Sequence, residues 1–133
     1  HSGNALEDRI KDMATGFTIW ATMMLIHIDG ILSDEEFSAL SYLFGDEIAK
    51  ELKEFYSKTP SVEQEDFIND MVKQELKKIE ELQLKDKEEI LFNIERLASV
   101  CDGDQRDIIH RLEFIAKLLD LDRKVEVRQM DFK

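Results

Sequence analysis

The sequence predicts an all-α protein, and three observations lead to this prediction. Apolar residues recur with the helical period of about 3.6 residues along most of the chain. No alternation of valine, isoleucine and threonine runs long enough to predict a sheet. The 133 residues include one proline and five glycines, so helix-breaking positions are few. We therefore expect a single multihelical domain over residues 1–133.

The first expected helix runs from about Ala5 to Ile28. Asn4 has the chemistry of an N-cap, and the Asp29-Gly30 pair ends the helix because glycine accepts the left-handed conformation that follows many helices. Trp20 widens the apolar stripe, as a central helix would require. The stripe itself consists of Leu6, Ile10, Met13, Phe17, Ala21, Met24, Leu25 and Ile28.

The second expected helix begins at Ser33 and ends at Gly45. Ser33 and Glu36 have the spacing of a capping box, in which each side chain bonds the other residue's backbone N–H. A third, short helix follows and stops at Pro60-Ser61, where proline favours a new helix start. Its apolar positions are Ile48, Leu52, Phe55 and Tyr56.

Three more helices are expected in the second half. The fourth extends from the Pro60-Ser61 break to Ile79, and the fifth begins near Asp86, with Asp86 and Glu89 as its cap pair. Asp102-Gly103 ends the fifth helix as Asp29-Gly30 ends the first. The sixth carries apolar residues from Ile108 to Leu119. Beyond Leu121 the pattern fades, and the weak alternation of Val125 and Val127 predicts no particular element.

The two Asp-Gly pairs indicate an internal repeat. When they are aligned, apolar positions of the first helix fall on apolar positions of the fifth: Phe17 on Ile90, Ala21 on Ile94, Met24 on Leu97 and Leu25 on Ala98. We interpret the chain as two three-helix repeats, about 5–58 and 61–121, with a tail at 122–133. A pseudo-twofold would relate two central helices and bring both Asp-Gly corners together.

The charge balance narrows the classes of partner. Eighteen basic against 30 acidic residues give a net charge of −12, which disfavours nucleic acid and anionic membrane surfaces. Residues 1–66 hold 14 of the acidic residues and 5 of the basic ones, so a cation or basic partner would experience the strongest field there. The longest uncharged stretch, residues 13–28, is shorter than the roughly 20 residues of a bilayer span, so we expect no direct membrane insertion.

Cys101 is the single cysteine of the chain. It can form neither an intramolecular disulfide nor a cysteine zinc site, and we expect a reducing, cytoplasmic setting. Its place on an apolar stripe predicts a small buried side chain. No phosphate-binding loop, dinucleotide-binding turn, hydrolase nucleophile elbow or zinc-binding helix motif is present.

An apolar helix that ends in Asp29-Gly30, followed by Leu32 and the acidic start Ser33-Asp34-Glu35-Glu36, resembles the tellurite-resistance TerB-like family. The resemblance covers roughly residues 13–121. It implies a two-fold repeat of three-helix units, a fold also seen in DnaJ-like co-chaperones. The second copy, from Asp102 to Asp107, lacks the aliphatic residue and the glutamate of the first.

The resemblance also implies metal-ion binding through acidic residues at these loops. The candidate ligands for a divalent cation, carried over by position, are Asp29, Glu35, Glu36, Asp102 and Asp107. Hard divalent cations take oxygen ligands, and a cation would relieve repulsion between clustered carboxylates. Each residue also has a structural interpretation: Asp29-Gly30 ends a helix, Glu36 closes a capping box, and Asp107 pairs with Arg111.

These observations favour a non-enzymatic, acidic helical binding module. The expected partner is another protein or a second copy of the chain. Divalent-cation binding at the Asp-Gly loops is the alternative function, and a metal-assisted enzyme with carboxylate chemistry is the third.

Overall fold

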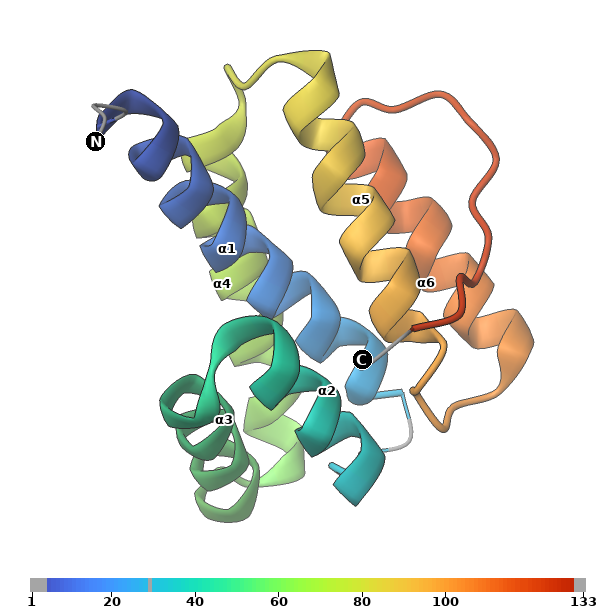
Figure 1. Ribbon diagram of the computed structural model, residues 1–133. Helices are drawn as coiled ribbons and strands as arrows, with labels where there is room; N and C mark the ends of the chain where they lie inside the picture. Colours follow the sequence, from blue (N-terminus) through green and yellow to red (C-terminus); the bar gives the residue numbers. More distant parts are fainter. Residues whose placement is uncertain (1–4, 29, 131–133) are drawn as a thin grey trace.

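The computed structural model describes residues 5–28 and 30–130, and this part of the chain is all-helical, without a strand (Figure 1). The predicted fold class is therefore confirmed. The proposed cap Asn4 lies outside the described residues. The helices are α1 (Ala5–Ile26), α2 (Asp34–Phe44), α3 (Asp46–Lys58), α4 (Ser61–Ile79), α5 (Leu84–Ala98) and α6 (Gln105–Leu118).

Helix α1 occupies the centre of the molecule. It packs lengthwise between α4 and α5 and also contacts α2 and α6 (Figure 1). A helix covered on several sides must be apolar on several sides, and the second half of α1 fulfils this requirement. Its buried apolar residues are Phe17, Ile19, Ala21, Met23, Met24, Leu25 and Ile26.

Helices α2 and α3 form a hairpin beside the C-terminal half of α1. The capping box at the start of α2 is confirmed: Glu36 N donates to Ser33 Oγ (3.1 Å), and Ser33 N donates to Glu36 Oε1 (2.8 Å). Gly45 joins the two helices with φ of 95°, a left-handed conformation that a residue with a Cβ rarely adopts. The turn chemistry of the sequence therefore fixes this hairpin locally.

One predicted helix start is wrong. Helix α5 begins at Leu84 rather than at a cap formed by Asp86 and Glu89, because the amides of Asp86 and Lys87 already donate to Gln83 O (3.0 and 3.1 Å). The Asp86 carboxylate instead lies in the first turn, where the partial positive charge of the helix N-terminus stabilises it.

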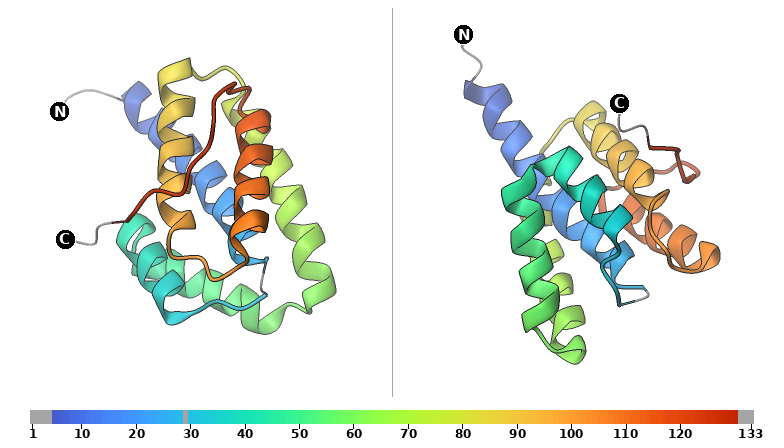
Figure 2. Two further views of the ribbon diagram at one scale, coloured as in Figure 1. Left: turned by 90° about the vertical axis from the view of Figure 1, so that its right-hand side faces the viewer. Right: turned by 60° about the horizontal axis from the view of Figure 1, so that its bottom comes forward.

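The segment after α6, residues 119–130, runs along α5 and α6 in a largely extended path (Figure 2, left). We call it the strap. Its side chains Leu121, Val125 and Met130 are buried, and Arg128 N donates to Glu95 O (3.1 Å). The sequence pattern supported no firm prediction beyond Leu121, and the strap is neither helix nor strand.

The positions matched by the internal repeat share their burial. Phe17, Ala21 and Leu25 in α1 and Ile90, Ile94 and Ala98 in α5 are all at most 2% exposed. The two helices that carry them lie side by side. The division into repeats at 5–58 and 61–121 and the pseudo-twofold stay predictions. Within the described residues, no helix is long and apolar enough to cross a bilayer.

Candidate functional site

The two Asp-Gly corners are neighbours, as expected from the repeat. Gly103 lies against Ile28, so close that a Cβ built on Gly103 would be 2.7 Å from Ile28 Cγ2. Asp102 N donates to Glu36 Oε2 across 3.4 Å, which links the end of α5 to the start of α2. Asp29 lies outside the described residues, so the structure does not place this candidate ligand.

Glu36 connects the two corners through its carboxylate. The residue is 1% exposed, and its two carboxylate oxygens accept from the backbone amides of Ser33 and Asp102. Backbone N–H donors stabilise a buried carboxylate by charge-assisted hydrogen bonds. The structural interpretation of Glu36 as part of a capping box is therefore correct, and the contact with Asp102 adds a second role that the sequence did not reveal.

The other described candidate ligands lie at the surface. Glu35, Asp102 and Asp107 are exposed. In the part of the chain that the structure describes, no three His, Cys, Asp or Glu residues are grouped so that they could hold a metal ion. Asp107 makes no ion pair with Arg111 there, whereas Asp104, which the sequence analysis did not single out, caps α6 by accepting from Arg106 N (2.8 Å).

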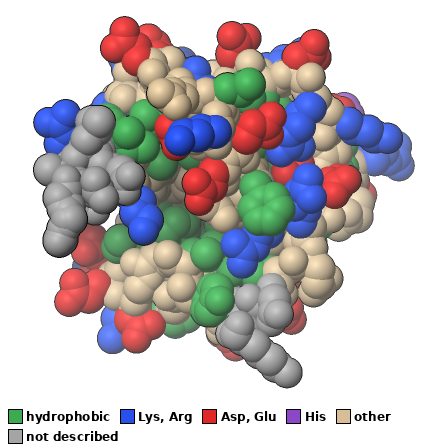
Figure 3. Space-filling model, turned by 45° about the horizontal axis from the view of Figure 1, so that its top comes forward, with side chains coloured by type: hydrophobic (Ala, Val, Ile, Leu, Met, Phe, Trp, Pro, Cys, Tyr) green, Lys and Arg blue, Asp and Glu red, His purple; other side chains and the backbone are tan. Residues whose placement is uncertain are grey.

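A groove lies between α1 and α5. Figure 3 shows a hollow with hydrophobic side chains at its base and charged side chains around its edge. The groove has a volume of about 690 Å³, and residues of the α4–α5 loop and the last residues of α2 contribute to its lining. Its apolar lining consists of Ile10, Ala14, Leu43, Phe44, Leu82 and Ile90.

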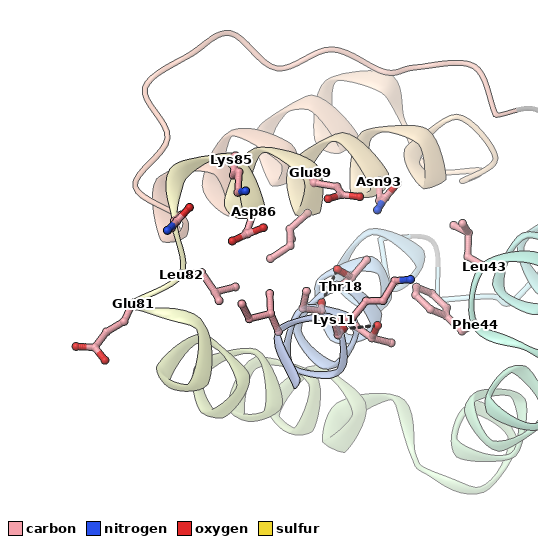
Figure 4. Close-up of a pocket in the computed structure, with 15 residues that line it drawn as sticks. Lys11, Thr18, Leu43, Phe44, Glu81, Leu82, Lys85, Asp86, Glu89 and Asn93 are labelled. Atoms are coloured by element: carbon pink, nitrogen blue, oxygen red, sulfur yellow. Dashed lines mark hydrogen bonds between the residues drawn. The ribbon is translucent and has the colours of Figure 1, made fainter. Parts of the chain in front are cut away.

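Charged side chains of both signs surround the groove (Figure 4). Asp86 and Glu89 project from α5, one helical turn apart, and Lys11 projects from α1 on the facing side. None of these three makes an ion pair within the described chain. They are therefore available to pair with charges on a molecule that enters the groove.

The polar groups at the base of the groove are already satisfied. The hydroxyls of Thr15 and Thr18 donate to the carbonyls one turn earlier in α1, Lys11 O (2.8 Å) and Ala14 O (2.7 Å). A hydroxyl bonded to its own helix does not require a partner from a ligand. The base can therefore take apolar groups without leaving these donors unpaired.

A second polar feature, beneath the strap, was missed by the sequence analysis. Glu95 is fully buried and accepts from Arg123 Nη1 and Nη2 (3.0 and 2.9 Å), Arg128 Nε (2.9 Å) and Glu126 N (2.8 Å). Burial raises the pKa of Glu95, but these hydrogen bonds outweigh burial and hold the pKa below its usual value. One signal was available: Glu95 stands one turn after Leu91, among the buried positions of α5.

Comparisons with protein-family models, with curated proteins and with solved structures found no match to this chain. The likeness to the TerB-like family therefore stays a prediction, carried by the residues around Asp29-Gly30.

Proposed function

We propose that this chain is a non-enzymatic protein-binding module of TerB-like type. In this proposal the groove between α1 and α5 receives an apolar helical segment of a partner protein. The observation that carries it is the combination of an apolar base with unpaired Lys11, Asp86 and Glu89 at the edges.

The composition of the groove fits such a partner. Amphipathic helices bind by laying an apolar face into a hydrophobic groove, with anchors one turn apart. Ile10 and Ala14 offer apolar contacts one turn apart on α1, and Leu82 and Phe44 bound the two ends. Charges of both signs at the edges would fix the direction of the bound helix, because a reversed helix would bring like charges together.

Photo-crosslinking tests this proposal. A benzophenone amino acid is placed at Gln83, which lines the groove, and in a matched variant at Gln105, an exposed position on α6. We expect one defined protein adduct at position 83 in cells and none at position 105. Equal adducts at both positions, or none at position 83, would contradict the proposal.

A blocking variant sharpens the test. Ala14→Phe places a large ring in the groove, and we expect the adduct at position 83 to disappear. Val62→Phe is the matched control, because Val62 is 82% exposed on α4 and away from the groove. Circular dichroism of both variants checks that the fold is retained. Retention of the adduct in Ala14→Phe would count against the groove.

Divalent-cation binding at the Asp-Gly corners is the second candidate function. The observation that favours it is the contact between Glu36 and Asp102, which brings the two acidic loops together. Calorimetry with calcium, magnesium, manganese and zinc would show heat and a raised melting temperature, since a ligand of the folded state stabilises it. Asp102→Asn should abolish both signals and Asp122→Asn should retain them. Absence of heat with all four ions would end this candidate.

A further inference from the structure

Three aromatic side chains from three helices form a partly exposed cluster on the side of α1 that faces α3 and α4. Trp20 of α1 meets Phe55 of α3 edge-on, with ring centroids 5.8 Å apart, and meets Phe67 of α4 at 5.5 Å. Phe55 and Phe67 are 5.2 Å apart. We call these three residues the aromatic patch. Phe67 is 45% exposed, whereas Trp20 and Phe55 are half-buried.

Carboxylates surround the aromatic patch. Glu63 and Asp70 lie one helical turn before and after Phe67 on α4, and Glu51 lies one turn before Phe55 on α3. Residues 46–70 contain eight acidic side chains, all exposed, and three lysines. Among the described residues, the single ion pair that involves this stretch joins Lys58 to Glu54 (3.4 Å), so the other carboxylates keep their charge unpaired.

We propose that the aromatic patch is a docking surface for a basic amphipathic helix of a partner protein. Exposed aromatic side chains are the preferred anchors of protein interfaces, and a charged edge selects partners of the opposite sign. A helix with apolar residues on one face and lysine or arginine beside them matches both properties of the surface.

Charge excludes the other occupants. A second copy of the chain, docked through the same surface, would place the acidic stretch against itself, and like charges across an interface are unfavourable. Phosphate backbones and anionic membranes are repelled for the same reason.

This surface is distinct from the groove of the proposed function. No residue of the aromatic patch lines the groove, which opens between α1 and α5. The patch joins α1 to α3 and α4, and Figure 1 shows α3 and α5 on opposite sides of α1. The two proposals can therefore fail independently.

Trp20 is the single tryptophan of the chain, so its emission reports directly on the patch. The probe is a synthetic helical peptide of leucine and lysine with an apolar stripe at helical spacing and no aromatic residue. We expect a saturable change in Trp20 fluorescence that weakens with added salt, because the carboxylate contribution is screened. The control peptide carries glutamate in place of each lysine and should not bind.

Variants test the two parts of the surface separately. Phe67→Ala should raise the dissociation constant about tenfold or more, as the loss of an interface anchor does. Glu63→Gln with Asp70→Asn should weaken binding and reduce its salt dependence. Phe114→Ala on α6 is the matched control, because Phe114 is similarly exposed, at 47%. Calorimetry measures the same constants without relying on Trp20.

Three outcomes would overturn the proposal that the aromatic patch binds a basic helix. Equal binding of the lysine and glutamate peptides, or an unchanged constant in Phe67→Ala, would overturn the proposal. So would a dimer of the free chain in sedimentation that Phe67→Ala abolishes, since the occupant would then be a second copy. Ala14→Phe, which fills the groove, should leave the peptide affinity unchanged.

Discussion

The guanidinium of Arg123 forms a two-pronged contact with the carboxylate of Glu95. Its Nη1 and Nη2 lie 3.0 and 2.9 Å from Oε2 and Oε1, and its Nε donates to Glu88 Oε1 at 2.7 Å. Such parallel bonds are the strongest form of arginine–carboxylate pairing. Because Glu95 is fully buried in α5 and Arg123 belongs to the strap, this pair joins the C-terminal segment to the helical core.

Glu95→Gln should destabilise the protein strongly. The amide keeps the shape of the carboxylate but loses its charge, so Arg123 and Arg128 lose the group they share. Breaking a buried ion pair on one side costs about 3 kcal/mol or more. Urea denaturation followed by circular dichroism measures the free energy of unfolding. The control is Glu126→Gln, whose pair with Arg128 is largely exposed and should contribute less than about 1 kcal/mol. Equal effects of the two variants would contradict this role of Glu95.

The Glu95 network also predicts that the free energy of unfolding depends on pH. The pKa of Glu95 in the folded protein lies below 4.5, its usual value in an unfolded chain. A lowered folded pKa stabilises the protein fully above the unfolded value, and this stabilisation is lost as the pH falls from there through the folded pKa. The gap in unfolding free energy between the wild type and Glu95→Gln should therefore be full at neutral pH and shrink below 4.5. A gap that stays constant on acidification would show that the carboxylate charge contributes nothing.

Gly103→Ala tests the contact between the two Asp-Gly corners. The new Cβ would lie 2.7 Å from Ile28 Cγ2, and the β-branched side chain of Ile28 has little freedom to move away. Overpacking of this kind costs about 1–3 kcal/mol. In an Ile28→Ala background the clashing methyl is absent, so the same substitution should cost less. Thermal unfolding of the four proteins of this cycle gives the coupling, and purely additive effects would show that the corners are not in contact.

Glu36→Ala tests whether this carboxylate is structural. The variant removes the acceptor for the amides of Ser33 and Asp102 together, whereas Ser33→Ala removes one cap bond. Loss of an N-cap costs about 1 kcal/mol, so Ser33→Ala should cost about that much and Glu36→Ala more. The measurement is chemical denaturation with a chelator present, which excludes a metal contribution. Full stability of Glu36→Ala under these conditions would contradict the structural role.

Local chemistry explains where prediction from the sequence succeeded. The capping box of Ser33 and Glu36, the glycine corner at Gly45 and the break at Pro60 are decided by neighbouring residues, and the structure bears them out. The predicted start of α5 was wrong because Asp86 and Glu89 fit the same cap pattern about one turn after the helix begins. The sequence does not show which amides are already bonded.

By itself the sequence determined the all-α class and the apolar face of each helix, since helical period and end signals act over a few residues. Only the tertiary structure decided that the strap packs over Glu95, that a groove forms between α1 and α5, and that the three rings of the aromatic patch meet. Each of these joins residues that are far apart along the chain, such as Glu95 with Arg123 or Trp20 with Phe67. Their meeting depends on how whole helices pack, and no local pattern encodes that.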